Sequence, residues 1–516
     1  MKLDVAILGA GMGGGLLARQ LAREMPGQRI GVFDKDTETS YKVGESTVEI
    51  GSSYMIRRVG LSRYLYENHL PKNGLRYFFD DENKSAELTE MSEIGTINLP
   101  FHPAFQVDRA RLDADLQDMN QRAGIGVHLG ARVTDLELGS DGAAHRFRIE
   151  REGRSDQVEC RWLLDATGRA ALLSRALGLR VRDETHRLHS VWGRFEGVAD
   201  VDDWGDPAFT ARVRHTSRGI STIHFCYPGY WIWFIPLGGG VTSIGFVGEP
   251  PVDPASMRSE AGFRAFLESH RAIASLLTHA KPIDTASLKN FTYGTRRFFS
   301  RDRWGLIGEA AAFGDPLYSP GADFIAIEND FLCDLVRRDL GGEADDEVAR
   351  RVDLYDDFMA FRYEAAMRLY RGLYGMLGSY ELMRLKWDFD IGCYYNLWVD
   401  PYLKDQYLDE RFVRRQVRQQ RFVLQALQNF AELFQQTEAH LRKKGEYYRN
   451  NLGLFAYGLE NIDFVEEVGL PRTQRVVLEK TAEIFNGVRR RGLALQEREA
   501  QENLALTTMM TPRPLV

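Results

Sequence analysis

The chain has 516 residues, and its hydrophobic fraction of 44% and charged fraction of 27% are those of an ordinary globular protein. That length accommodates one large core with an appended domain and excludes a minimal binding module. A formal net charge of -7 at pH 7 provides no basic field for phosphate backbones, so we expect no nucleic-acid partner.

The cysteines and the apolar runs narrow the class further. Cys160, Cys226, Cys333 and Cys393 are far apart and form no C-x-x-C pair, which argues against a zinc site, an iron–sulfur cluster or a disulfide framework. No apolar run approaches the roughly 20 residues that span a bilayer, and the N-terminus lacks the pattern of a signal peptide. We therefore expect a cytoplasmic protein that binds neither a metal nor a membrane.

The first residues predict a strand, a tight turn and a helix. An apolar run over residues 3–8 precedes Gly9-Ala10-Gly11-Met12-Gly13-Gly14-Gly15, and a helix-forming stretch follows over residues 16–24. In Gly9-x-Gly11-x-x-Gly14 the backbone turns tightly and approaches a pyrophosphate at the N-terminus of the helix. A second strand over residues 30–33 ends in Asp34, which is suitably placed for ribose hydroxyls. An incidental glycine-rich turn is the alternative to this dinucleotide site.

Two later segments favour FAD over NAD. Residues 163–168 predict a buried strand that contains Asp165 and ends in an A-T-G turn typical of flavoproteins. Gly308-Glu309-Ala310-Ala311 resembles the ribityl-binding G-D-A-A segment of the same proteins, with Glu309 in place of the usual Asp. That contact then needs the longer side chain or a water molecule. Either segment alone could be a strand end followed by small residues.

The organisation resembles an FAD-binding, glutathione-reductase-like α/β fold of Rossmann type. We expect its core in residues 1–185, closed by residues 301–340, with a mixed β-sheet substrate region inserted at 186–300. Beyond about residue 340 strand signals vanish and apolar residues recur at helical spacing, which predicts a helical C-terminal domain at 341–516. Aromatic residues between 358 and 398 favour a helical core, although they could also roof an aromatic substrate pocket.

Two signatures make the resemblance specific. Trp231-Ile232-Trp233-Phe234-Ile235-Pro236 matches the W-x-W-x-I-P signature of flavin-dependent halogenases, and residues 313–321 are similar to their F-x-x-P-x-x-S-x-G segment. The resemblance covers residues 1–335 and is nearest to the phenol and pyrrole types within the tryptophan-halogenase-like superfamily. It implies that Trp231 and Trp233 lie beside the flavin and keep the substrate away from it. An aromatic strand packed on one face is the structural alternative.

The resemblance also assigns the remaining site residues. Lys72-Asn73-Gly74-Leu75-Arg76-Tyr77 fits the family's K-x-G-x-x-F/Y setting, and Val43-Gly44-Glu45-Ser46-Thr47 is similar to its I-G-E-S-x segment. Lys72 is then catalytic, although a lone lysine is most often a solvated surface charge. The implied cofactor-binding residues are Gly9, Gly11, Gly14, Asp34, Glu45, Ser46, Arg109, Asp165, Glu309 and Pro316.

The family chemistry follows from these positions. By resemblance, reduced FAD and O2 form a flavin hydroperoxide, a halide ion attacks it, and hypohalous acid travels to Lys72, which holds it or becomes a haloamine. The halide is expected in a turn at Ser319, Gly321 and Ala322. Because Pro320 has no N–H, donation falls to Gly321 and Ala322.

Substrate and partners are less constrained. Tryptophan-specific members carry Glu directly before the motif serine, where this chain has Tyr318, so we expect a phenol or pyrrole substrate, free or tethered to a carrier protein. No second nucleotide motif is evident, so we expect a separate flavin reductase to supply the reduced cofactor. The alternatives are an FAD-dependent aromatic monooxygenase or dehydrogenase in which Lys72 is incidental, and a non-catalytic flavin-binding partner in a biosynthetic complex.

Overall fold

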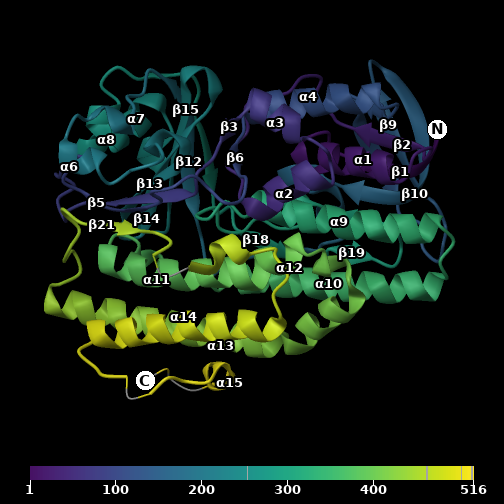
Figure 1. The fold of residues 1–516 in the computed structure, drawn as a ribbon. Coiled ribbons are helices and arrows are strands. Elements are labelled where there is room, and N and C mark those ends of the chain that lie inside the picture. The colour runs from purple at the N-terminus through teal and green to yellow at the C-terminus, as the bar shows by residue number, and fades with distance from the viewer. Residues whose placement is uncertain (253, 461–462, 501, 513–514, 516) are drawn as a thin grey trace.

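The computed structural model describes residues 1–516 except 253, 461–462, 501, 513–514 and 516. Two large sheets occupy the upper half of the molecule, and the long helices of the C-terminal half run beneath them (Figure 1). The substrate region and the cofactor core therefore share one helical base.

The first sheet carries the predicted dinucleotide turn. Its path is β19-β20-β10-β1-β2-β7, and β9 joins β10 and β8. Parallel pairing brings Leu8, Asp165 and Leu306, the last residues of β1, β10 and β20, into register at one edge of the sheet. Ligands of open α/β sheets bind at this carboxyl edge. The strands are β1 Lys2–Leu8, β2 Ile30–Phe33, β7 Gly126–His128, β8 Arg132–Glu137, β9 His145–Arg151, β10 Arg154–Asp165, β19 Phe299–Ser300 and β20 Trp304–Leu306.

The second sheet is the mixed sheet expected for the substrate region, but it draws strands from outside 186–300. Its path is β16-β12-β15-β14-β13-β4-β5-β21, with β17 beside β12. The strands are β4 Leu75–Phe79, β5 Ser92–Gly95, β12 His189–Glu196, β13 Thr222–Tyr227, β14 Tyr230–Pro236, β15 Val241–Gly248, β16 Lys281–Pro282, β17 Ala286–Lys289 and β21 Phe455–Tyr457.

One expectation was wrong in detail, because β21 is a strand beyond residue 340. It pairs in parallel with β5, opposite Glu93 to Gly95. Its three residues are too few for an alternating pattern to be recognised in sequence. Two small sheets complete the β structure, β3 Leu70–Pro71 with β6 Phe105–Gln106 and β11 Arg180–Arg182 with β18 Tyr293–Thr295.

The helical character expected for the C-terminal half is confirmed. Its core joins α11, α13 and α14, where the ring of Phe389 lies 4.3 Å from that of Phe430 and 4.7 Å from that of Phe485. The helices are α1 Met12–Glu24, α2 Glu49–Arg57, α3 Ser62–Asn68, α4 Arg109–Arg122, α5 Leu172–Ala176, α6 Pro207–Thr210, α7 Glu260–Glu268, α8 Arg271–Leu276, α9 Gly321–Leu340, α10 Asp345–Met367, α11 Tyr380–Cys393, α12 Asp400–Leu403, α13 Glu410–Lys444, α14 Gln474–Leu495 and α15 Leu506–Met509.

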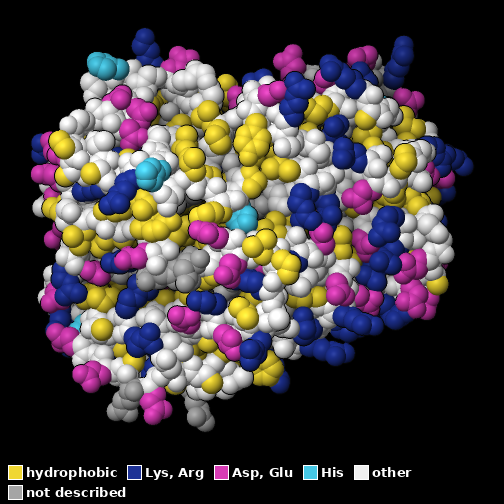
Figure 2. All heavy atoms as spheres, in the orientation of Figure 1, with side chains coloured by type: hydrophobic (Ala, Val, Ile, Leu, Met, Phe, Trp, Pro, Cys, Tyr) yellow, Lys and Arg dark blue, Asp and Glu magenta, His cyan; other side chains and the backbone are white. Residues whose placement is uncertain are grey.

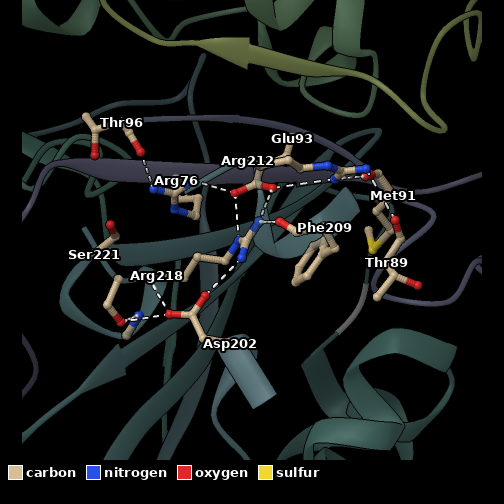
Figure 3. Close-up of polar contacts among 12 residues, drawn as sticks. Arg76, Thr89, Met91, Glu93, Thr96, Asp202, Phe209, Arg212, Arg218 and Ser221 are labelled. Carbon is tan, nitrogen blue, oxygen red and sulfur yellow. Dashed lines mark hydrogen bonds and ion pairs between the residues drawn. The ribbon is translucent and has the colours of Figure 1, made fainter. Parts of the chain in front are cut away.

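A buried charge cluster, the Glu93 cluster, fixes the strand that follows Lys72 (Figure 3). Arg218 donates from Nε and Nη2 to the two carboxylate oxygens of Glu93 at 2.9 and 3.0 Å, and Arg76 of β4 pairs with the same carboxylate. Arg218 also contacts Asp202 at 2.9 Å. Arg76 further donates to the carbonyl oxygen of Thr96 at 2.7 Å, so the cluster anchors the segment after β5.

Basic and acidic side chains are interspersed over the face in Figure 2, in keeping with the small net charge. Within the part of the chain that the structure describes, we find no helix that combines the length and the apolarity needed to cross a membrane.

Candidate active site

In the glycine turn between β1 and α1, Gly9 and Gly14 are tightly packed, whereas the space beside Gly11 is open. Gly9 has a φ of +102°, and an added Cβ would lie 2.3 Å from the carbonyl oxygen of Ala166; a Cβ on Gly14 would lie 2.1 Å from the carbonyl oxygen of Gly9. A Cβ on Gly11 would meet only a carboxylate oxygen of Asp113, at 3.5 Å. Since α1 has no side-chain cap, its first N–H groups are left for a ligand in that space.

The two acidic residues at the same edge have different surroundings. Asp34 follows β2, and its Oδ2 accepts from the N–H of Ala10 at 2.8 Å. Asp165 is fully buried, with Oδ1 accepting from the N–H and hydroxyl of Thr167 and Oδ2 accepting from the N–H of Leu173. These bonds shape the A-T-G turn, so a direct contact of Asp165 with FAD stays a prediction.

A largely apolar cavity, the first cavity, is walled by strands of the second sheet, α9 and α10. It brings together residues that lie far apart in sequence. The predicted site residues in its lining are Glu45, Ser46, Arg109, Trp231, Trp233, Glu309, Pro316, Ser319, Gly321 and Ala322.

Four carboxylates line this cavity, and two of them, Glu45 and Glu309, are predicted site residues. Arg194 donates from Nε and Nη2 to Oε1 of Glu45 at 3.0 and 2.8 Å. Burial raises the pKa of Glu45, and Arg194 opposes that rise. Burial likewise raises the pKa of Glu309, opposed by Arg169. Glu309, the residue that departs from G-D-A-A, is thus among the residues that line the cavity.

The two tryptophans of β14 form one wall of the first cavity. Their ring centroids are 5.7 Å apart, and the Nε1 of Trp233 donates to Oγ of Ser243 at 3.3 Å. The Nε1 of Trp231 donates to the hydroxyl of Tyr374 at 3.1 Å. Each indole is thus fixed by its own hydrogen bond.

Behind Trp231 lies a polar chain that the sequence did not indicate. The hydroxyl of Tyr374 donates to Oδ2 of Asp315 at 2.7 Å, and Nε2 of His186 lies 2.8 Å from the same oxygen. Burial alone would lower the pKa of His186, but hydrogen bonds to Asp315 and Glu249 outweigh it and raise the pKa to about 9. Asp315 stands at an unspecified position of the 313–321 segment, and His186 and Tyr374 belong to no motif, so only the fold brings the three together.

Lys72 is buried, with 1% of its surface exposed, so the alternative of a solvated surface lysine is wrong. Its Nζ donates to Oγ of Ser46 at 2.7 Å and to the carbonyl oxygen of Thr47 at 2.9 Å. The hydroxyl of Ser46 in turn lies 3.1 Å from that of Ser319. Burial lowers the pKa of Lys72 to about 7, against the opposing effect of nearby carboxylates.

A second cavity lies on the other side of residues 46–49. Pro320, Phe324, Ala366 and Tyr370 line both cavities, and Ser46 lines the first while Val48 and Glu49 line the second. Lys72 itself lines neither cavity, but its amine contacts Ser46, which lines the first, and Thr47, which precedes Val48 of the second. The walls of this second cavity are largely aromatic, and several rings come from the 358–398 segment that could roof a substrate pocket. The rings are Phe101, Tyr318, Phe324, Tyr370, Trp387, Tyr394, Tyr395 and Trp398.

Asp390 of α11 brings a carboxylate to the second cavity beside Tyr318. The hydroxyl of Tyr318 donates to Oδ2 of Asp390 at 2.5 Å, and Lys386 pairs with the same oxygen. Oδ1 of Asp390 is buried, lies in a residue that lines the cavity, and has no hydrogen-bond partner among the described residues. Burial raises the pKa of Asp390, and Lys386 opposes this. In the sequence, only the i, i+4 spacing of Lys386 and Asp390 indicated that these two side chains would pair on one helix.

The turn expected to bind halide lies at the N-terminus of α9. Ser319 has a φ of +57°, and Pro320 precedes the helix without a side-chain cap. Gly321 and Ala322 are first-turn residues, whose N–H groups have no acceptor within a helix. Both line the first cavity.

Residues 2–317 match the family model described as FAD binding domain. The flavin-dependent halogenase chlA of Dictyostelium discoideum is 26% identical over 451 residues, which are 78% of this chain and 71% of that protein. The 1H-pyrrole-2-carbonyl-[peptidyl-carrier protein] chlorinase of Pseudomonas fluorescens is 26% identical over 343 residues, which are 62% of this chain and 72% of that protein.

The fold is similar along its whole length to that of the halogenase PltM. The two structures share a TM-score of 0.67 and 16% identity, and the match covers 99% of each chain. One PltM structure is a complex with phloroglucinol and FAD. With the FAD-binding domain matched over more than half of the chain, this enzyme belongs to the FAD-binding-domain family and, within it, to the flavin-dependent halogenases.

Proposed function

We propose that this halogenase is a two-component enzyme that installs chloride or bromide on an electron-rich aromatic of the phenol or pyrrole type, free or carrier-tethered. The observation that carries the proposal is the buried amine of Lys72, which bonds to Ser46 of the first cavity at 2.7 Å and to the carbonyl oxygen of Thr47, next to Val48 of the second cavity. A residue in that position meets whatever passes from one cavity to the other.

The residues of the first cavity fit FAD. The open front of Gly11 and the uncapped α1 accommodate a pyrophosphate, and Glu309 faces the cavity for a ribityl hydroxyl. When bound in its reduced form, FAD together with O2 supplies the oxidising power that converts a halide ion to hypohalous acid.

Halide binding is assigned to the turn before α9. Ser319, Gly321 and Ala322 line the first cavity, and backbone N–H groups at a helix N-terminus attract anions. Trp231 and Trp233 close the same cavity with apolar rings, which leaves the aromatic substrate to the second cavity.

Lys72 connects the two cavities chemically. With a pKa of about 7, its ammonium and amine forms are both populated near neutral pH. The ammonium donates a hydrogen bond to the oxygen of hypohalous acid. The amine nitrogen instead bonds to the halogen, the oxygen–halogen bond breaks, and water leaves with one amine proton, so a haloamine remains. Either form presents electrophilic halogen to a ring carbon.

The second cavity suits an electron-rich ring. Its aromatic walls hold a planar substrate, and the unpartnered Oδ1 of Asp390 accepts an O–H or N–H. Accepting that proton raises the electron density of the ring, so the cavity does not need a glutamate in place of Tyr318. Phloroglucinol in the PltM complex is a phenol, and the Pseudomonas relative is named for a pyrrole on a carrier protein.

A separate flavin reductase is proposed as the source of reduced FAD, since the sequence has one glycine-rich dinucleotide motif. The decisive experiment combines the protein with FAD, a flavin reductase, NADH and bromide over phenols and pyrroles, free and carrier-bound. Bromine isotope doublets in the mass spectrum support the proposal. A hydroxylated product that forms equally well without bromide would establish the monooxygenase alternative instead.

A further inference from the structure

We infer that the second cavity selects aromatic substrates that carry a carboxylate, and that Arg362 is the residue that binds it. The inference rests on the proposed function, since it names the substrate class of the same cavity. It concerns binding, however, and can therefore be tested without turnover.

Arg362 is a buried cation with unused donors. It lies on α10, is 4% exposed and lines the second cavity, with its guanidinium carbon 4.0 Å from the ring centroid of Trp398. Neither its Nε nor its Nη1 has a hydrogen-bond partner among the described residues. Trp398 thus supports the flat face of the guanidinium and Tyr407 hydrogen-bonds to the same group, while Nε and Nη1 have no partner among the described residues.

Arginines buried more deeply than Arg362 are paired with carboxylates, whereas Arg489, buried to the same degree, donates to backbone carbonyl oxygens. Arg194 contacts Glu45 at 2.8 Å, and Arg218 contacts Glu93 at 2.9 Å, as Figure 3 shows for the latter. A guanidinium stays protonated in proteins, and an unpaired buried charge costs free energy. Burial of the Arg362 charge therefore costs free energy that the binding of an anionic ligand would offset.

The carboxylates that line the cavity have other partners. Asp323 accepts from the hydroxyl of Tyr394 at 3.0 Å, and Glu49 accepts from that of Tyr395 at 2.8 Å. Asp390 is paired with a lysine. Asp323 influences the guanidinium through space, but no carboxylate of the described residues lies within 4.0 Å of it.

The chemistry of the missing partner follows from these facts. A full negative charge is needed at neutral pH, which a carboxylate has and an ordinary phenol with a pKa near 10 lacks. Charge-assisted hydrogen bonds to a guanidinium are about twice as strong as neutral ones. A carboxylate on Arg362 and a ring hydroxyl on Asp390 would fix the orientation of a hydroxyaryl acid between aromatic walls.

Binding is measured on the FAD-loaded protein without halide or reductant, by the quenching of tryptophan fluorescence, because Trp387 and Trp398 line the cavity. The probes are 2,4-dihydroxybenzoate and its methyl ester. We expect the acid to bind at least about tenfold more tightly than the ester. In Arg362→Met that preference should vanish, while Arg362→Lys should keep part of it.

The matched control is Arg368→Met. Arg368 lies directly after α10, pairs with Glu364 at 3.0 Å and does not line the cavity, so its loss removes the same charge without the same effect. The melting temperature of Arg362→Met should not fall, since an unpaired buried charge is removed; this separates lost binding from lost folding.

Equal dissociation constants for acid and ester in the wild type would overturn the inference, as would an unchanged preference in Arg362→Met. Its failure is distinguishable from that of the proposed function. A halogenase without the acid preference refutes only the role of Arg362, whereas an acid preference without any halogenated product refutes only the proposed activity.

Discussion

The amine of Lys72 donates a hydrogen bond to the hydroxyl of Ser46 at 2.7 Å, and that hydroxyl lies 3.1 Å from the hydroxyl of Ser319. One short polar line thus runs from the buried lysine to the turn before α9. The lysine and the proposed halide site are joined although Lys72 and Ser319 lie 247 positions apart in the sequence (319 − 72).

Lys72→Ala should leave FAD binding intact and remove the halogenated product, because the lysine acts after hypohalous acid has formed. Lys72→Arg should not restore product, since guanidinium is bulkier and stays charged. Product is followed by mass spectrometry and FAD binding by absorbance. Halogenation by Lys72→Ala at the wild-type rate would refute the mechanism.

The depressed pKa of Lys72 predicts a pH-dependent stability. The folded protein loses this proton at about pH 7, whereas the unfolded chain keeps it until near its ordinary value of 10.5. The unfolded state therefore binds more protons in that window, and the wild type gains stability as pH rises through it. Lys72→Met lacks this term, so its stability relative to the wild type should be greatest near about pH 6 and should decline toward about pH 9.

Melting temperatures of both proteins at each pH measure this difference. The hydrogen bonds that Lys72→Met loses change its melting temperature by the same amount at every pH. The informative quantity is therefore how the difference between the two proteins changes with pH. A difference independent of pH would show that the lysine titrates near its ordinary value.

Gly11→Val should abolish FAD binding in a protein that still folds. The φ of Gly11 is -77°, which any residue adopts, and its side-chain space is open, so the valine would fill the space proposed for the pyrophosphate. Gly487→Val is the matched control, because that glycine has nothing within 4 Å of its side-chain position and lies on α14. A folded Gly11→Val protein that retains full FAD would exclude this turn as the cofactor site.

Local patterns predicted much of the fold and of the first cavity. β2 spans the residues expected for it, and the tryptophans of β14 and the serine of the Ser319 turn line one cavity. Such features are read from sequence because each lies within one short segment. The spacing of Lys386 and Asp390 indicates a pair on one helix, but the roles of Asp390 and Arg362 in the cavity could not be predicted, since they depend on how α10 and α11 pack over the sheets. The chain from Trp231 through Tyr374 to Asp315 has the same origin.

NADPH or NADH alone should reduce the bound flavin slowly, and addition of a flavin reductase should restore turnover. The reason is the single dinucleotide motif, which FAD is proposed to occupy. Stopped-flow absorbance follows the bleaching of the flavin. Rapid and saturable bleaching by NADPH without a reductase would favour the aromatic monooxygenase alternative.

Glu93→Gln should destabilise the protein strongly, because Arg76 and Arg218 would lose the carboxylate that pairs with both while remaining buried. Removing one partner of a buried ion pair costs about 3–5 kcal/mol. Glu82→Gln makes the same chemical change at an exposed position and should shift stability by less than about 0.5 kcal/mol. The free energy of unfolding from denaturant titration gives both values. Equal stabilities of the two variants would show that the Glu93 cluster contributes no net stability.

Glu93→Gln should also weaken substrate binding more than FAD binding, because Arg76 bonds Thr96 beside the second cavity.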